Sequence, residues 1–356
     1  MRLLHAFLIE TRSGKDRRLL RILTGSGLLF GLLVAGCTSQ ASRTEAVATG
    51  APPSRHKTVD IDPAPRSGVP LPQALQFVLA HENVRSAPYY PFEGLAGVTY
   101  QNDGTLYVCD EQGGRVHAWS AARNRWFQFN SPGSRYFRPV DIQVDGFHAL
   151  VLDQDDRELL RYDLGGVFLD RFLDFTYLQP GYDRVPTAFD VDLDGSLVVT
   201  DGGEHQVLIL DGYLSVRETI GGPGHHRERF DNPAGVVFTR NGGIVVSDRD
   251  NRRLQRFARN GAYDGEVGGL DDPSNPLLTP GGLDRDEFGN IFVADAAAGA
   301  VHVYSSELKH LFSLGNDIQL SDMPEAPVDV AVGPDGLLAV SDRSRQAVLI
   351  YRILYR

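Results

Sequence analysis

Two short motifs place a carboxylate where chemistry is possible. The tripeptide Pro-Val-Asp occurs twice, ending at Asp141 and at Asp329, and each copy opens an apolar run typical of a β-strand. Paired carboxylates can bind a divalent cation through their oxygen atoms or act as general acid and base. Aspartate at a strand start can also cap backbone amides, and we favour that structural interpretation. Glu93, just before another strand, is a third acid that could join the pair.

Arginine clusters in one segment, "GVVFTRNGGIVVSDRDNRRLQRF", residues 235–257. Four of its five arginines fall within eight residues: Arg249, Arg252, Arg253 and Arg256. Such a cluster is either a recognition patch or a set of strand residues paired with neighbouring acids, and we favour pairing. The formal net charge of the chain is -11. Because phosphate binding depends on a basic field, nucleic acid is excluded as a partner.

Cysteine and histidine add little chemistry. Cys109 stands in the strand-like run "LYVCD", which predicts a buried, unreactive thiol. His117 and His302 share one position of a repeating unit, which predicts that they lie on the repeat surface and not in a channel. No set of histidines fits a metal site, so a divalent cation held by carboxylates is the one cofactor the sequence suggests.

These residues belong to a repeat. A short apolar run ending in Asp, here called the anchor Asp, recurs six times at spacings of 43, 48, 47, 47 and 47 residues. An aromatic residue or leucine follows each anchor nine positions later, and most runs are preceded by a glycine-containing turn. The anchors are Asp110, Asp153, Asp201, Asp248, Asp295 and Asp342. Periods of this length, with short strands and turns, predict an all-β, six-bladed β-propeller.

The repeat resembles the NHL family, whose consensus runs P-x-G-V, then D-x-x-G-N-I-Y-V-A-D, then N-x-R-V-x-V-F. "NPAGVVFTRNGGIVVSDRDNRRLQRF" follows it nearly throughout, and "GGLDRDEFGNIFVAD" follows its first half. The resemblance covers roughly residues 90–351. Propeller sites usually lie at the mouth of the axial channel, near the first strands. Aligning the blades on the anchor Asp gives one such residue in each: Gly97, Asp141, Ala188, Gly235, Gly282 and Asp329.

Ring closure requires a strand from the N-terminal side. The chain ends with the third strand of the sixth blade, and an open blade edge would be prone to aggregate. "ALQFVLAHEN", residues 74–83, precedes the first blade as "RWFQF", residues 125–129, precedes the second. We therefore expect residues 76–80 to form the outer strand of the sixth blade. The propeller domain is assigned to residues 71–356.

The N-terminal residues predict export and a lipid anchor. A basic head is followed by a 15-residue apolar run, 22–36, which is too short to span a bilayer and typical of a secretory signal. Its end, "LVAGC", resembles the bacterial lipobox, which implies cleavage after residue 36 and a lipid on Cys37. Residues 37–70 contain five prolines and no aromatic residue, and are interpreted as a flexible tether. Thr38 after the cysteine favours the outer membrane.

We conclude from the sequence that this is a lipid-anchored propeller that binds a protein, peptide or glycan at the bacterial cell envelope. A metal-dependent hydrolase, lactonase or lyase with its site in the axial channel is the alternative. The resemblance implies for lactonases of similar six-bladed fold a Glu, Asn, Asn and Asp set near the axis. Glu93 and Asp329 match the ends of that set, but no asparagines align with its middle. Non-enzymatic binding is therefore preferred.

Overall fold

The computed structural model describes residues 70–82, 92–133, 137–179, 181–315 and 322–356. The predicted signal segment 1–36, the lipid-attachment residue Cys37 and the predicted tether up to residue 69 lie outside the described residues. Two 3-10 turns, η1 (Phe175–Tyr177) and η2 (Pro334–Gly336), are the helical elements of the described part. Neither is long and apolar enough to cross a membrane.

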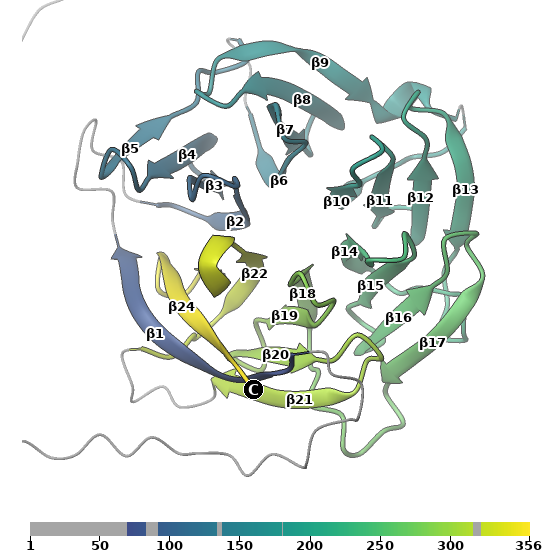
Figure 1. Ribbon diagram of the computed structural model, residues 1–356. Coiled ribbons are helices and arrows are strands. Elements are labelled where there is room, and N and C mark those ends of the chain that lie inside the picture. Colours follow the sequence, from purple (N-terminus) through teal and green to yellow (C-terminus); the bar gives the residue numbers. More distant parts are fainter. Residues whose placement is uncertain (1–69, 83–91, 134–136, 180, 316–321) are drawn as a thin grey trace, which may run out of the picture. The chain divides into compact units, whose positions relative to one another are not determined.

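The described strands form six antiparallel four-stranded sheets arranged as blades around a central axis (Figure 1). Blade 1 contains β2 (Leu95–Tyr100), β3 (Leu106–Asp110), β4 (Arg115–Ser120) and β5 (Arg125–Gln128). Blade 2 contains β6 (Pro139–Val144), β7 (His148–Asp153), β8 (Glu158–Asp163) and β9 (Phe168–Asp174). Blade 3 contains β10 (Pro186–Val191), β11 (Leu197–Asp201), β12 (Gln206–Leu210) and β13 (Val216–Gly221).

The second half of the ring repeats the same order, with the first strand of each blade nearest the axis (Figure 1). Blade 4 contains β14 (Pro233–Phe238), β15 (Ile244–Asp248), β16 (Arg253–Phe257) and β17 (Tyr263–Gly268). Blade 5 contains β18 (Pro280–Arg285), β19 (Ile291–Asp295), β20 (Ala300–Tyr304) and β21 (His310–Gly315). Blade 6 contains β22 (Pro327–Val332), β23 (Leu337–Asp342), β24 (Ala347–Tyr355) and β1 (Pro72–Glu82). The predicted six-bladed β-propeller is confirmed.

The closing strand of the ring is β1, which comes from the N-terminal side as predicted. It pairs antiparallel with β24 from Pro72 to Glu82, a longer strand than the sequence indicated. Phe77 lies opposite Tyr351, and their rings stand edge to face with centroids 5.8 Å apart. His81 reaches the next blade, where its ring lies 4.9 Å from that of Trp119. The strand therefore joins the last blade to the first.

The hydrophobic core is divided among the interfaces between neighbouring blades. One cluster joins blades 1 and 2 through side chains such as Tyr107 and Tyr162, and another joins blades 5, 6 and β1 through Tyr351. The remaining interfaces have equivalent clusters. The aromatic residue nine positions after the anchor Asp supplies this packing, which is why the repeat retains it. Cys109 is a fully buried free thiol in the first cluster, as predicted, and burial raises its pKa.

The anchor Asp has a different role, which is to hold each blade's first strand in place. All six side chains are almost fully buried. Asp201 Oδ1, for example, accepts the backbone N–H groups of Val185 at 2.9 Å and Gly203 at 3.1 Å. The first N–H precedes β10 and the second follows β11, so one carboxylate ties together the two loops at the same end of the blade. A charge-assisted bond of this kind is about twice as strong as a neutral one.

Candidate functional site

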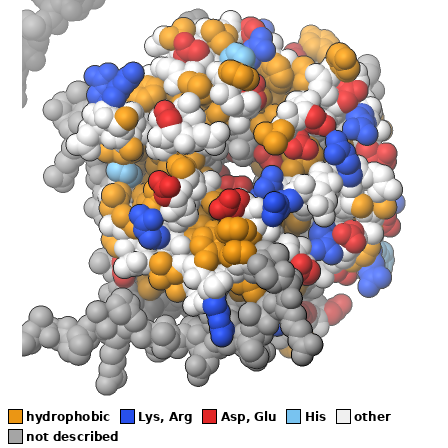
Figure 2. All heavy atoms as spheres, in the orientation of Figure 1, with side chains coloured by type: hydrophobic (Ala, Val, Ile, Leu, Met, Phe, Trp, Pro, Cys, Tyr) orange, Lys and Arg blue, Asp and Glu red, His pale blue; other side chains and the backbone are white. Residues whose placement is uncertain are grey.

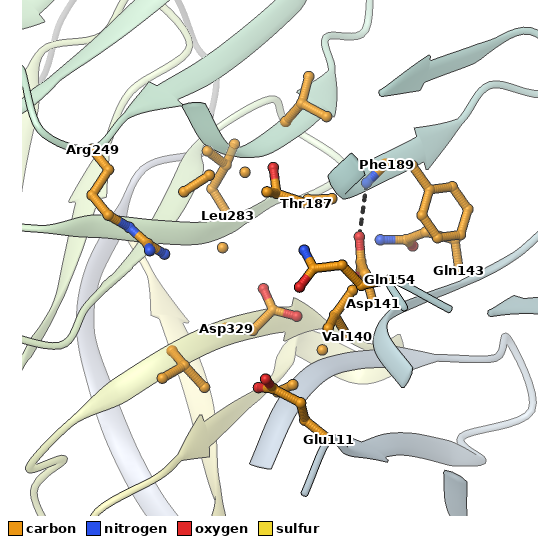
Figure 3. Close-up of a pocket in the computed structure, with 18 of the residues that line it drawn as sticks. Glu111, Val140, Asp141, Gln143, Gln154, Thr187, Phe189, Arg249, Leu283 and Asp329 are labelled. Carbon is orange, nitrogen blue, oxygen red and sulfur yellow. Dashed lines mark hydrogen bonds between the residues drawn. The ribbon is translucent and has the colours of Figure 1, made fainter. Parts of the chain in front are cut away.

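The axial channel opens into a cavity of about 270 Å³. The first residues of the six inner strands form its wall, together with residues that directly follow an anchor Asp (Figure 3). All six positions aligned from the sequence line it: Gly97, Asp141, Ala188, Gly235, Gly282 and Asp329. The space-filling view shows the other face of the ring, with η2 and the C-terminus in front, where a hollow near the middle has charged side chains of both signs around it (Figure 2). The alignment thus located the channel mouth correctly.

Asp141 and Asp329 both face this cavity, and both hold backbone amides of a neighbouring blade. Asp141 Oδ1 accepts the N–H of Ile142 at 2.7 Å, and its Oδ2 accepts the N–H of Phe189 in blade 3 at 2.8 Å. Asp329 Oδ2 accepts the N–H of Val98 in blade 1 at 2.8 Å. Each carboxylate therefore staples its own inner strand to the next one. These bonds fit the capping interpretation made from the sequence.

Glycine beside each of these aspartates is required by space. A Cβ atom at Gly282 would lie 1.8 Å from Asp329 Oδ1, and one at Gly97 would lie 2.6 Å from the Cα atom of Asp141. Real Cβ atoms never approach so closely, so the preceding blade needs glycine wherever its neighbour carries the stapling carboxylate. The two Gly–Asp neighbours in the channel, Gly97 with Asp141 and Gly282 with Asp329, follow from this packing.

Two further carboxylates, which the sequence analysis missed, continue the same pattern deeper in the channel. Asp190 Oδ2 accepts the N–H of Phe238 in blade 4, and Asp284 Oδ2 accepts the N–H of Val332 in blade 6, each at 2.7 Å. Both stand two residues beyond the aligned channel position. Alternate residues of a strand share a face, so this offset of two could have predicted that Asp190 and Asp284 face the channel.

Burial changes the acidity of all four carboxyl groups. It raises the pKa of Asp141 to about 7, that of Asp190 to about 6 and that of Asp284 to about 7. The pKa of Asp329 is raised as well, first by burial and then by the nearby charge of Asp141. The bonds from backbone N–H groups favour the ionised form but only partly offset the cost of desolvation. Near neutral pH the channel therefore carries less negative charge than four carboxylates would suggest.

The wall of the cavity contains three arginines, at positions 138, 249 and 343. Glu111 accepts from two of them: Arg138 Nη2 lies 2.5 Å from its Oε1, and Arg343 Nη2 lies 2.8 Å from its Oε2. Arg138 also lies 3.5 Å from Asp155. Arg249 lines the cavity from blade 4, with its guanidinium directed inward (Figure 3). The sequence placed Arg249 in a surface patch, and its position at the channel was missed.

The four clustered arginines do not form one surface, which corrects the patch prediction. Arg253 is buried, and its Nε donates to Asp248 at 2.8 Å while its Nη1 donates to Glu266 at 3.1 Å. Arg256 Nε lies 2.9 Å from Asp264 Oδ2. Arg252 is exposed in a turn with a φ of 53°. The preferred alternative, ion pairing with neighbouring acids, describes Arg253 and Arg256.

The predictions for three other residues are also corrected. Glu93 does not line the cavity: its carboxylate is half exposed and lies 3.4 Å from Arg115 Nη1. His117 and His302 are 3% and 2% exposed, not surface residues. Their Nε2 atoms lie 3.7 and 3.6 Å from the anchor carboxylates of their own blades. The repeat position was identified correctly, but periodicity did not show which side of the third strand faces the adjacent blade.

The described residues do not fit a metal centre built from acidic, histidine or cysteine side chains. No group of three or more such side chains is arranged to hold an ion in that part of the chain. The stapling oxygen atoms of Asp141 and Asp329 already accept backbone N–H groups, and a divalent ion would have to displace those donors. A divalent cation at this pair, one of the options raised by the sequence, is therefore not supported by the geometry of the donors.

A second cavity, of about 420 Å³, lies at the first-hairpin turns of blades 1, 5 and 6. Its charged residues are largely occupied within the fold. Arg285 Nε donates to the backbone oxygen of Phe238 at 2.5 Å, and Asp286 Oδ2 accepts from Asn290 at 2.7 Å and from Tyr355 at 3.1 Å. The first cavity is the stronger candidate site because Arg249, which lines it, has no such partner among the described residues.

Comparison with known proteins supports the fold more than any activity. Residues 230–257 match the NHL repeat, and the sequence matches none of the curated proteins. Virginiamycin B lyase from Staphylococcus aureus superposes with a TM-score of 0.53 at 11% identity, covering 80% of this chain and 89% of the lyase. A gluconolactonase from Xanthomonas campestris gives 0.56 at 15% identity, covering 80% and 98%.

A third similar structure is the calcium-binding protein regucalcin from Agrobacterium tumefaciens. Its TM-score is 0.56 at 18% identity, and the match covers 75% of this chain and 92% of regucalcin. Identities this low show a shared propeller fold alone, since the same fold hosts unrelated chemistries. A lyase, a lactonase and a calcium-binding protein all stand within the same range of similarity.

Proposed function

We propose that this chain is a binding module that holds part of a peptide or glycan ligand in the cavity at the channel mouth. The main support for the proposal is that some polar groups of that cavity are bonded to the protein and another is not. The deep carboxylates Asp141 and Asp329 are bonded to the fold, whereas the guanidinium of Arg249 is directed into open space (Figure 3). The guanidinium of Arg249 is therefore available to bind a ligand in this cavity.

Its size also fits binding of a small group. Ligand pockets usually have volumes of about 300–1,000 Å³, and this one, at about 270 Å³, lies just below that range. It would hold one or two residues of a peptide or one sugar ring, with the remainder of the ligand outside. Gln154 and Asn232 on the wall can exchange hydrogen bonds with hydroxyl or amide groups.

The test is to fill the cavity with a side chain. Ala234 lines the wall, and Ala234→Phe should abolish retention of peptides or oligosaccharides from an envelope digest, measured by native mass spectrometry. Ala262→Phe is the matched control, because Ala262 is exposed in a turn of the same blade. Equal retention by the two variants and the wild type, at equal melting temperatures, would reject this cavity as the binding site.

A second candidate function, acid–base catalysis in the same cavity, is favoured by one observation. The pKa of Asp141, raised by burial to about 7, lies where a general acid or base works best. An enzyme of this kind should turn over lactones or sugar lactones without added metal, and Asp141→Asn should abolish turnover while ligand binding persists. Binding without turnover in the wild type supports the module instead.

We propose further that the propeller works at the bacterial cell envelope, held by a lipid on Cys37. The basis is the apolar run before Cys37 and the "LVAGC" sequence. Replacing Cys37 with serine should move the protein from the membrane fraction to the soluble fraction, or leave the precursor uncut. Unchanged membrane association of a processed Cys37→Ser protein would disprove the lipid anchor.

A further inference from the structure

Arg249 follows the anchor Asp of blade 4 at the point where the chain turns from β15 toward β16. The equivalent residues of blades 1, 2 and 6 are Glu111, Gln154 and Arg343, and all four line the same cavity. The wall therefore carries one polar side chain from each of four blades at the same level. Arg249 reaches the cavity from the side of the ring opposite blade 1 (Figures 1 and 3).

Arg249 differs from other arginines of the propeller in its bonding. Arg138 and Arg343 share Glu111, and Arg253 makes ion pairs with Asp248 and Glu266. Within the described part of the chain, Arg249 has neither a hydrogen bond nor an ion pair. It is also partly buried, and that burial lowers the pKa of its guanidinium. The charges of Asp250 and Asp295 oppose this shift, and the like charge of Arg343 adds to it.

The charges around the cavity leave room for one added anion. Three guanidinium groups line the cavity wall, and the acid among them, Glu111, already pairs with two of the three. Asp141 and Asp329 lie deeper, bonded to backbone N–H groups, with their pKa values raised by burial. An unpaired cation that is partly removed from water is destabilising, and a bound anion would relieve that cost.

We propose that Arg249 is the receptor for a carboxylate group of the ligand, an inference that rests on the proposed binding function of this cavity. The planar fork of a guanidinium matches the two oxygen atoms of a carboxylate. Gln154 Nε2 donates to the backbone oxygen of Pro186 at 2.9 Å, so its Oε1 can accept from a hydroxyl or amide group beside the carboxylate. The ligand is therefore an acid with a neighbouring hydrogen-bond donor.

A carboxylate fits better than a phosphate for a reason of charge. Arg249 has no ion pair with any described residue, and three acidic side chains, Glu111, Asp141 and Asp329, line the same cavity. A monoanion can be neutralised by Arg249 alone, whereas a phosphate dianion would leave excess negative charge facing Asp141 and Asp329. The terminal carboxylate of a peptide and the carboxylate of a uronic acid both satisfy this chemistry.

The experiment uses matched probes with and without the charge. N-acetyl-dialanine is compared with its C-terminal amide, glucuronate with glucose, and acetate with inorganic phosphate, by calorimetry on the wild-type protein. We expect each carboxylate to bind more tightly than its neutral counterpart, and acetate more tightly than phosphate. The tighter of the first two acids identifies peptide or sugar acid as the natural source.

Three variants assign the effect to Arg249. Arg249→Gln should weaken binding of the preferred acid by about 10- to 100-fold, as expected for losing a bond between charged groups. Arg249→Lys keeps the charge but loses the planar fork of the guanidinium, so its affinity should lie between those of the wild type and Arg249→Gln. Arg252→Gln, an exposed arginine of the same turn, should bind like the wild type.

The proposal is overturned if the neutral probes bind as well as the acids, if phosphate binds more tightly than acetate, or if Arg249→Gln retains full affinity. Absence of binding by every carboxylate probe also overturns it. The proposed function can survive any of these results, because it fails only if Ala234→Phe does not reduce ligand retention. The two failures are therefore distinguishable.

Discussion

The stapling carboxylates and Arg249 are charged groups of one channel with opposite relations to the fold. Asp190 and Asp284 are bonded to backbone amides of a neighbouring blade, and removing either would leave buried donors without acceptors. Arg249 has no bond to any described part of the propeller, and the ring would close without it. A charged side chain in a propeller channel can therefore serve the fold alone, and its presence does not by itself indicate a binding or catalytic site. A charged side chain that makes no bond within the fold is better evidence for a binding site.

The largest effect should come from the outer closure of the ring, to which neither group contributes. A chain starting at residue 83 lacks β1 and should lose on the order of 5 kcal/mol of unfolding free energy, from several apolar side chains at about 1.5–3 kcal/mol each. A chain starting at residue 71 keeps β1 and should melt like the full protein. Urea denaturation of both chains measures this, and equal midpoints would contradict the role given to β1.

Removing one staple should have the next largest effect. Asp190→Ala leaves the N–H groups of Phe238 and Val191 without their acceptor and should cost about 2–4 kcal/mol, since each buried unpaired donor costs about 1–3 kcal/mol. Asp192→Ala, in the same hairpin, removes one bond to the exposed Leu193 and is the control. If the two variants were equally stable, the stapling role of Asp190 would be wrong.

The titration of the channel carboxyl groups should make the free energy of unfolding depend on pH. Because burial raises the pKa of Asp141 to about 7 from 3.8, the native state binds more protons than the unfolded chain between these values. The contribution of this group is fully present below pH 4 and is lost as pH rises toward 7. The raised pKa of Asp329 acts in the same direction.

His81 opposes this trend, because burial lowers its pKa to about 4 from 6.5, and the measurement must therefore be a difference. The free energy of unfolding is compared for wild type and for Asp141→Asn with Asp329→Asn at pH 5 and pH 8. Relative to the double variant, the wild type should be less stable at pH 8 than at pH 5. A difference that does not change with pH would show that the two carboxyl groups titrate normally.

The smallest effect should be that of Arg249 on stability, and its sign should be reversed. Arg249→Gln removes a partly buried, unpaired cation, so the free energy of unfolding should stay unchanged or rise by up to about 1 kcal/mol. Arg253→Gln, which breaks two ion pairs of a buried guanidinium, should instead be strongly destabilising. Thermal unfolding of both variants tests the contrast, and a marked loss of stability in Arg249→Gln would mean that the fold does use this charge.

The sequence determined the repeat, and with it much of the fold. The anchor Asp, the aromatic residue nine positions later and the glycine-containing turn mark six blades because each blade needs the same buried bond and the same interface packing. The closing strand also followed from the sequence, since the sixth blade had three strands and an unpaired edge would be unstable. Even the channel positions of Asp141 and Asp329 could be found by alignment, because identical blades place equivalent residues at equivalent depth.

Tertiary structure alone decided what each charge does. The sequence brought Arg249, Arg252, Arg253 and Arg256 together, but the turn after β15 and the alternation of β16 direct them to different environments. Glu93 stands close to a first strand in the chain and still lies outside the cavity, because its loop carries it to Arg115. The stapling carboxylates Asp141, Asp190 and Asp284 bond to backbone N–H groups 48 residues away in the next blade, and no local pattern contains that distance.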